Sequence, residues 1–384
     1  MKYVLNPEKP FPVMLLLYSV LVSCLLSCEG LTGLQAGGNG KNDIQSEAVT
    51  IVSWNSQTLF DGEEHGTEYS DYLPSEGWNT EKFNARLLSL GEAIQKIGKN
   101  GPDILALQEV ENPAVLELLA EKALSGSGYG HSFFSKSPGT ALGIGIISRF
   151  PLSSPKVHAI VFNGEAAPRP VLEIWIELEN SPIVLFICHW KSKLGGDSTT
   201  ETLRRASARI ILRRLKEIEN QTPGIPVLIM GDLNENHDEF YRQAGNYICA
   251  ILPDDPKAAE LAMQETVFRD SSEEAGYQGD FLIISAEKPP KTVYFPGAVQ
   301  VFYSPWEQEL KNGSYYYKNE WETIDHLLFS PGWFDDAGWE FDSCAVVDTP
   351  PFTSVKGVPV PYNPRTGYGL SDHLPLMATI KKSP

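Results

Sequence analysis

The sequence is poor in cysteine: the chain of 384 residues has five, and two of them lie in its apolar N-terminal stretch. The remaining three, Cys188, Cys249 and Cys344, make a disulfide framework improbable, so a hydrophobic core must hold the fold. The sequence also has no His-x-x-x-His and no closely paired cysteines, which disfavours a zinc hydrolase.

Positive charge is scarce as well. The chain has 31 lysines and arginines against 49 aspartates and glutamates, which gives a formal charge of -18. This balance argues against a basic surface that binds nucleic acid non-specifically, although a local basic cleft is compatible with it. The hydrophobic content of 42% is enough for a large buried core and excludes a disordered chain.

The only long apolar run is N-terminal. Lysines precede the stretch 11–28, which has the charged and apolar regions of an export signal and is short for a membrane span. Its end, Leu25–Cys28, resembles a bacterial lipoprotein processing box, and Cys24 ends a weaker alternative. We therefore expect an exported lipoprotein, lipidated on Cys28 and anchored to a membrane outside the cytoplasm, on its periplasmic or surface face.

The domain organisation follows from composition. Residues 1–27 are the predicted signal peptide, and 28–47 form a Gly-rich tether without periodicity. Residues 48–384 form the predicted catalytic domain, in which 251–322, rich in Pro, Gly and Tyr, is expected to be an insertion of loops over one edge.

Short apolar runs alternate with helical patterns along this domain, and several runs are apolar on both faces. Helical spacing runs from Phe83 to Ile97 and from Leu203 to Ile218, the latter behind a predicted capping box, Ser198–Glu201. The pattern predicts one two-layered α/β domain. The predicted strands are 49–54, 103–110, 141–148, 171–178, 182–190, 225–231, 323–330 and 374–380.

Polar side chains gather where these strands begin or end. Such positions from distant parts of a sheet can converge on one rim, where α/β enzymes commonly build a site. Taken singly, each has an ordinary explanation as a solvated carboxylate or a turn, and isolated histidines such as His65, His131 and His158 are typical of surface or core positions. The terminal polar residues are Asn55, Gln108, Glu109, His189, Lys191, Lys193, Asp232, Asn234, Asp325, Asp372 and His373.

Taken together, these residues belong to short motifs whose order resembles the endonuclease/exonuclease/phosphatase superfamily. The motifs are SWN at 53–55, LQEV at 107–110, CHWKSK at 188–193, GDLNE at 231–235, IDHLLFS at 324–330 and SDHLP at 371–375. The resemblance covers about residues 49–382. It implies an α/β fold like that of pancreatic deoxyribonuclease: a four-layer sandwich of two packed, mainly antiparallel β-sheets flanked by helices.

The resemblance also implies a metal-dependent phosphodiesterase. Glu109, Asn55 and Asp372 match the family's ligands for Mg²⁺, for which Mn²⁺ or Ca²⁺ are alternatives, and such hard cations prefer oxygen. His189 matches a histidine that contacts the phosphoryl oxygens. The substrate class is a phosphoester, most naturally a nucleic acid, and a monomer is expected.

The remaining roles follow from side-chain chemistry. His373 suits the general base that activates water, and Asp325, a carboxylate in an apolar strand, needs a partner such as this imidazole. Asp232 and Asn234, spaced by two, are expected to share one face of an extended segment, where they would hold the attacking water, a second cation or the phosphate.

Lys191 and Arg204 are phosphate-binding candidates within a basic cluster that also includes Lys193 and Arg205; a solvated helix start explains that cluster equally well. Arg149 is a separate and weaker phosphate candidate. The alternatives to a nuclease are an inositol-phosphate phosphatase, a sphingomyelin phosphodiesterase, and a non-catalytic surface lipoprotein. The aromatic segment 313–322 offers tyrosines that could stack on bases, although such side chains more often pack.

Overall fold

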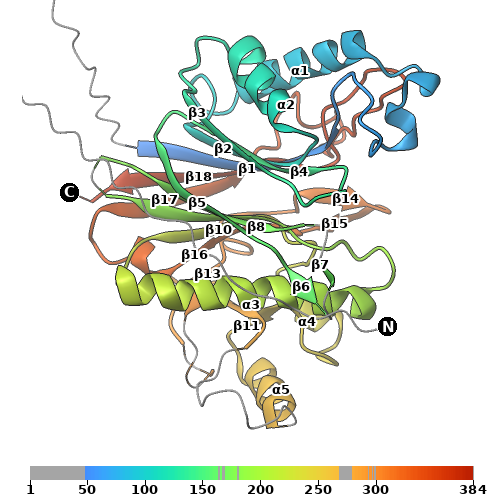
Figure 1. The fold of residues 1–384 in the computed structure, drawn as a ribbon. Coiled ribbons are helices and arrows are strands. Elements are labelled where there is room, and N and C mark those ends of the chain that lie inside the picture. The colour runs from blue at the N-terminus through green and yellow to red at the C-terminus, as the bar shows by residue number, and fades with distance from the viewer. Residues whose placement is uncertain are drawn as a thin grey trace, which may run out of the picture. The chain divides into compact units, whose positions relative to one another are not determined.

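The apolar runs form the central strands of two sheets in the computed structural model (Figure 1). The described residues belong to one compact unit, Ser46–Pro384, so the predicted signal peptide, the tether and Cys28 lie outside them. No helix among the described residues is long and apolar enough to cross a membrane. The structure describes residues 48–383 except 163–164, 167–168, 180, 268–278, 293, 296 and 298–299.

The first sheet has six strands, and the second has eight. All eight predicted strands are present. In spatial order the first sheet comprises β17 (Trp339–Val346), β18 (Leu376–Lys382), β1 (Ala48–Leu59), β2 (Ile104–Val110), β4 (Gly143–Ser148) and β3 (His131–Ser135). The second comprises β11 (Ile251–Pro253), β12 (Leu282–Ser285), β13 (Val301–Tyr303), β16 (Asp325–Phe329), β10 (Val227–Asp232), β9 (Ile183–His189), β8 (Val171–Ile176) and β5 (Leu152–His158).

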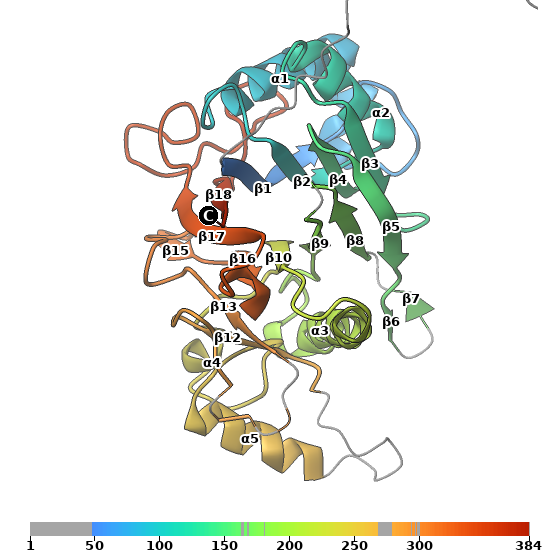
Figure 2. The same cartoon turned by 90° about the vertical axis from the view of Figure 1, so that its left-hand side faces the viewer.

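Three buried cores separate four layers (Figures 1 and 2). Between the sheets, Ile51 and Ile146 belong to the same cluster as Leu185 and Met230. Helices α1 (Thr80–Ile94) and α2 (Pro113–Leu118) cover the outer face of the first sheet, and α3 (Asp197–Gln221) covers that of the second. Two layers were expected from periodicity alone, but strands that are apolar on both faces require cover on both sides. The four-layer prediction is confirmed.

The predicted capping box at the start of α3 does not form. The helix begins at Asp197, its N-cap is Gly196, and no side chain caps it. Glu201 is instead buried, where it accepts hydrogen bonds from Arg204 and from the backbone N–H of Ala250. The helix starts two residues earlier than the motif requires, and Glu201 then lies on the buried side of the helix.

The segment 251–322 is more than a set of loops. Its strands β11, β12 and β13 complete one edge of the second sheet, and α5 (Pro256–Val267) packs with them in a separate small core. The segment ends in a hairpin of β14 (Tyr315–Tyr317) and β15 (Glu320–Glu322). Short elements complete the described fold: β6 (Val161–Phe162), β7 (Glu165–Ala166), α4 (Glu239–Arg242), the 3-10 helices Ser70–Tyr72, Pro74–Glu76 and Pro331–Trp333, and the short π-helix Leu119–Ala123.

Strand direction brings the motifs to one edge. β1 is parallel to β2, and β9 is parallel to β10, so each pair presents its carboxyl ends together. β18 runs antiparallel to β1, and β16 runs antiparallel to β10, so their first residues lie at that same edge. Residues from six separate segments are thereby assembled at one end of both sheets.

Candidate active site

Irregular backbone at the ends of β1 and β2 places the first two polar side chains. The register between these strands shifts after Asn55, and Glu109 lies at a bulge between β2 and β4 with a φ of +64°. A non-glycine residue in this conformation is costly, and such residues cluster at functional sites. The carboxylate of Glu109 is held by the backbone N–H of Thr58 at 2.8 Å.

Asn55 joins the two sheets. Its Nδ2 donates to Glu109 Oε1 at 3.3 Å and to Asp232 Oδ2 at 3.1 Å. Its Oδ1 accepts the backbone N–H of Gln57 at 2.9 Å, which identifies the oxygen side of the amide. Asn55 therefore orients both carboxylates in this structure, and the metal-ligand role that the sequence motif implied for it stays a prediction.

The close pairing of β10 with β9 depends on Gly231. Its φ is +130°, and a Cβ there would lie 2.0 Å from the carbonyl oxygen of Cys188 on β9. Asp232 Oδ1 accepts the backbone N–H of Asn234, which has a φ of +52°. The prediction that Asp232 and Asn234 share one face of an extended segment is wrong, because this side-chain bond closes a turn. Asn234 Nδ2 instead donates to the carbonyl of Trp190 at 3.1 Å.

Asp325 and His373 form a buried pair. His373 Nδ1 lies 2.7 Å from Asp325 Oδ2, and the two residues are 6% and 2% exposed. Ser314 Oγ donates to the same Asp325 oxygen at 2.6 Å, while the indole N–H of Trp54 donates to the carbonyl of His373. The predicted pairing of the acid with this histidine is confirmed. Their neighbour His326 points away and bonds the carbonyl of Glu235, as strand alternation predicts.

The pKa values at the site diverge. Burial and the charge of Asp325 together raise the pKa of Asp232 to about 7. Burial by itself lowers the pKa of His373, but the charge and hydrogen bond of Asp325 outweigh it and hold that pKa at about 10. Burial, with the positive charge of Arg169 beside it, lowers the pKa of His189 well below 6.5, so this imidazole is neutral at pH 7.

The donors suit a divalent cation. His189 Nε2 lies 3.7 Å from Glu109 Oε1 and 3.5 Å from Asp232 Oδ2. Burial raises the pKa of Asp372 most, and the nearby charge of Glu109 raises it further. A group of close, largely buried carboxylates is costly without a compensating charge, and oxygen donors fit Mg²⁺ or Mn²⁺. Glu109 and Asp372 would hold the cation, with Asp232 next to them.

Two of the three expected phosphate-binding residues are engaged elsewhere. Arg204 is fully buried and pairs with Glu201 at 2.6 Å. Arg149 pairs with Asp103 at 2.8 Å, and this aspartate binds Thr50, at the opposite end of β1 from Asn55. These two predictions are wrong, because both guanidinium groups have structural partners: Arg149 pairs with Asp103, distant in sequence, and Arg204 pairs with Glu201 in its own helix.

The other basic residues of the cluster differ from one another. Lys193 pairs with Glu239, and Arg205 pairs with Asp280. Lys191 is half-buried, and its Nζ donates to the carbonyls of Ser192 and Leu194. Burial lowers the pKa of Lys191, and the positive charges of Arg169 and Arg204 lower it further. Lys191 is therefore close enough to Arg169 to interact with it electrostatically.

Sequence reasoning missed Arg169 and Ser314. Arg169 donates to the carbonyl of Trp190, and its charge lowers the pKa values of His189 and Asp232. It lies between prolines, outside every recognisable motif, and only the fold brings it to the site. Ser314 had no signal beyond its position beside a tyrosine run.

Comparison with known proteins decides the family. The model of the Endonuclease/Exonuclease/phosphatase family matches residues 50–285, more than half of the chain. The chain belongs to this family. Its described sheets and helices form the deoxyribonuclease-I-like sandwich that the motifs implied. No curated protein matches the chain.

Several solved structures are similar to this family member. A truncated TDP2 from Caenorhabditis elegans has 16% identity and a TM-score of 0.48, with 87% of this chain and 97% of that chain covered. TDP2 from D. rerio, complexed with a single strand DNA product, has 16% identity and a TM-score of 0.49, with coverage of 88% and 100%. The catalytic domain of human Nocturnin with a bound sulfate anion has 16% identity and a TM-score of 0.48, with coverage of 88% and 94%.

In this family member, Tyr315 and Tyr317 form an aromatic column that begins at His373 and runs toward the surface. The ring of Tyr315 lies 4.6 Å from that of His373, and Tyr317 stacks behind Tyr315 at 6.0 Å. The outer ring of Tyr317 is 48% exposed. Tyr316 faces the other side of the hairpin and packs against Trp321, as strand alternation requires.

Proposed function

We propose that this protein is a divalent-metal-dependent phosphodiesterase that cleaves nucleic acid. The observation that carries the proposal is the buried Asp325–His373 pair, 2.7 Å apart, next to carboxylates that lack enough basic partners. General base catalysis, an oriented imidazole and charge neutralisation at a phosphoryl group need this combination.

The residues divide the work as follows. The positive charge of a cation at Glu109 and Asp372 would lower the pKa of His373 from about 10, and neutral His373, oriented through Nδ1 by Asp325, would take a proton from the attacking water at Nε2. Neutral His189 donates to a phosphoryl oxygen, and Arg169 and Lys191 add positive charge on the side of Trp190. A divalent cation held by Glu109 and Asp372 would supply positive charge at the phosphoryl oxygens.

The aromatic column favours nucleic acid as the substrate. Tyr315 and Tyr317 offer ring faces in line from His373 outward, and the Nζ of Lys318 lies 5.0 Å from the ring centre of Tyr317. Base stacking on such a platform contributes roughly 1 to 3 kcal/mol per base. An inositol polyphosphate would require several free basic residues, whereas Arg204, Arg149 and Lys193 are all ion-paired.

A substrate panel tests the proposal. Single- and double-stranded DNA, RNA, inositol phosphates and sphingomyelin are offered with Mg²⁺, with Mn²⁺, and with chelator. We expect cation-dependent cleavage of nucleic acid, weakened in Tyr317→Ala and not in Tyr368→Ala, which removes an exposed tyrosine outside the column. Selective turnover of inositol phosphate or sphingomyelin would favour the corresponding alternative. Full activity in chelator would contradict metal dependence, and no turnover by the folded protein would favour a binding lipoprotein.

The localisation proposal is separate and rests on the N-terminal sequence. We infer that the enzyme is held outside the cytoplasm by a lipid on Cys28, as a monomer. Cys28→Ala should leave the precursor unprocessed or release the protein from membranes, and Cys24→Ala is its matched control. Retention of a mature Cys28→Ala protein in the membrane fraction would contradict the anchor.

A further inference from the structure

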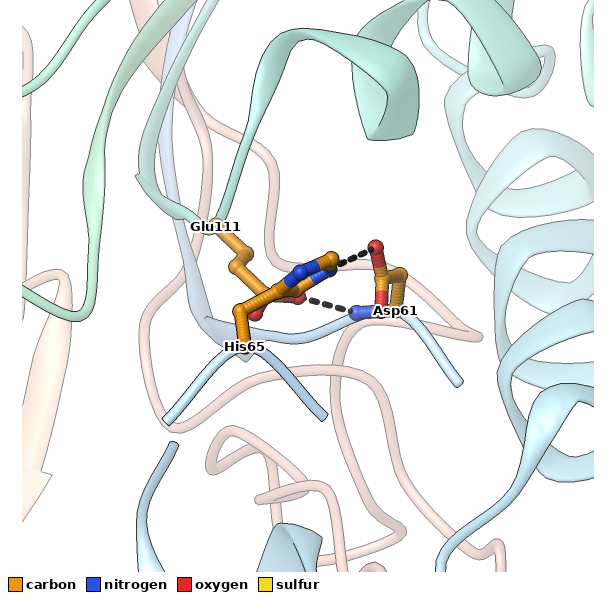
Figure 3. Close-up of side chains that lie close together, drawn as sticks. All are labelled: Asp61, His65 and Glu111. Carbon is orange, nitrogen blue, oxygen red and sulfur yellow. Dashed lines mark hydrogen bonds and ion pairs between the residues drawn. The ribbon is translucent and has the colours of Figure 1, made fainter. Parts of the chain in front are cut away.

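A second cluster of ligating side chains lies just past the ends of β1 and β2. Asp61 follows β1, and Glu111 follows β2, so the parallel pairing of these strands brings the two carboxyl groups together. His65 enters from the loop that begins at Asp61. Figure 3 shows the three side chains pointing toward one another, and their ligating atoms all lie within 4.8 Å.

Hydrogen bonds from neighbouring groups hold the carboxylates of this cluster in place. Asp61 Oδ2 accepts from Asn112 Nδ2 at 2.7 Å, and Asn112 Oδ1 accepts the backbone N–H of Val115 and so caps α2. Glu111 Oε2 accepts the backbone N–H of Asp61 at 2.7 Å. His65 Nε2 lies 3.2 Å from Asp61 Oδ2. Carboxylates held by outer hydrogen bonds are typical of metal sites.

One oxygen of Glu111 accepts no hydrogen bond from a donor group, and its neighbour is another acid, Glu68. Glu111 is 1% exposed, and its Oε1 is buried without a hydrogen bond. Among the described residues, no lysine or arginine forms an ion pair with Asp61, Glu68 or Glu111. A buried carboxylate oxygen directed at another acid and an imidazole requires a shared proton or a cation.

We propose that Asp61, His65 and Glu111 form a second metal site, distinct from the candidate active site, which takes a divalent transition metal of the zinc class. An imidazole with carboxylates suits Zn²⁺ better than Mg²⁺ or Ca²⁺, which prefer oxygen alone. Zinc bonds of about 2.0 to 2.2 Å place tetrahedral ligands roughly 3.3 to 3.6 Å apart, and the 3.2 Å between His65 Nε2 and Asp61 Oδ2 lies just below that range.

The site would fasten a loop that borders the active site. The loop carries Tyr69, whose ring packs on that of Phe60 at 5.3 Å. Burial raises the pKa of Tyr69 most, and the nearby carboxylate of Glu109 raises it further. Thr58 connects the two regions, because its N–H binds Glu109 and its hydroxyl pairs with that of Tyr72. Zinc bound here would therefore be structural, positioning the wall beside Glu109.

Zinc titration of the whole chain by calorimetry tests the site. We expect the wild type to bind one zinc equivalent that His65→Ala lacks or binds at least about tenfold more weakly. His131→Ala removes another exposed histidine, on β3, and should keep that equivalent. Because His65 is exposed, its replacement does not threaten the fold, whereas Glu111→Gln does and serves as the second variant. Anomalous diffraction at the zinc edge should place the metal at Glu111 Oε1.

The outcomes separate this site from the proposed function. Asp372→Asn, which alters the candidate active site, should retain the His65-dependent equivalent whether or not it retains phosphodiesterase activity. Equal zinc stoichiometry and affinity in wild type and His65→Ala would overturn the proposal. If wild type and His65→Ala bind equal amounts of zinc, and Glu111→Gln is more stable than wild type, the cluster instead holds a proton shared by Glu111 and Glu68.

Discussion

Two groups of buried charges in the described structure contrast sharply. Glu173 on β8 is fully buried and meets three basic partners: Arg214 at 2.7 and 2.9 Å, His158 at 2.8 Å and Lys156 at 3.4 Å. Burial raises the pKa of Glu173, but Arg214 and the other partners outweigh it and hold that pKa well below its usual range. At the candidate active site, burial and neighbouring acids raise the pKa values of Asp232 and Asp372 instead.

The difference separates a structural role from a functional one. The charge of Glu173 is balanced within the fold, so it needs nothing from outside. The carboxylates of the candidate active site outnumber their basic partners, which costs stability unless a cation joins them. Four predictions probe this contrast, starting with the largest expected effect.

The Asp325–His373 pair should act as one unit. His373→Ala should lower kcat/KM by roughly a hundredfold to ten-thousandfold, the usual contribution of a general base. Asp325→Asn should also be impaired, and adding it to His373→Ala should cost little more, since residues that act together are not additive. Steady-state kinetics on the single and double variants measures this, with circular dichroism as the control for folding. Losses that simply multiply would make Asp325 a structural carboxylate.

Removing the charge of Glu173 should lower the stability of the protein without lowering its catalytic activity. Glu173→Gln leaves Arg214 and His158 without their buried anion, so unfolding free energy should fall by roughly 3 to 5 kcal/mol. Urea denaturation measures the loss, and the activity per folded molecule should equal that of the wild type. Glu177→Gln, which changes another glutamate next to β8, is the control and should change stability little. A large loss of kcat/KM in folded Glu173→Gln would erase the distinction between the two groups.

Mg²⁺ should stabilise the folded protein only through the candidate active site, where carboxylates outnumber basic partners. At a concentration of roughly 100 times Kd, binding adds about 2.7 kcal/mol to the unfolding free energy. Glu173→Gln should retain that increment, whereas Asp372→Asn should lose most of it because a ligand charge is gone. Thermal unfolding with and without Mg²⁺ measures the increment for each protein. The same Mg²⁺ increment in Asp372→Asn and wild type would remove Asp372 from the cation site.

The pH dependence of stability should show the balance at Glu173. Its pKa is lower in the folded chain than in the unfolded chain, so its ionisation stabilises the fold above the unfolded value near 4.5. This contribution is lost as the pH falls from that value toward the folded pKa. The stability difference between wild type and Glu173→Gln should therefore be constant from pH 6 to 8 and shrink below about pH 4.5. A difference that grows on acidification would reverse the sign assigned to this group.

Local patterns predicted much of this molecule. Continuous apolar runs identified the eight predicted strands, because a strand buried on both faces must be apolar throughout. Asp325 could be paired with His373 from sequence, since a carboxylate in an apolar strand needs a partner. Misassignments arose where a side chain found a partner distant in sequence, as with Arg149 and Asp103, or Arg204 and Glu235.

The sequence by itself determined the family, the strand positions and the polar residues at strand ends, because these depend on local composition and short motifs. Only the tertiary structure decided which charges are balanced. Arg169 reaches the site, and Arg204 is buried away from phosphate, through packing of segments far apart in the chain. Asp61, His65 and Glu111 likewise became a cluster only through the pairing of β1 with β2. The pKa of a buried group depends on distances to its neighbours, and those distances exist only in the folded chain.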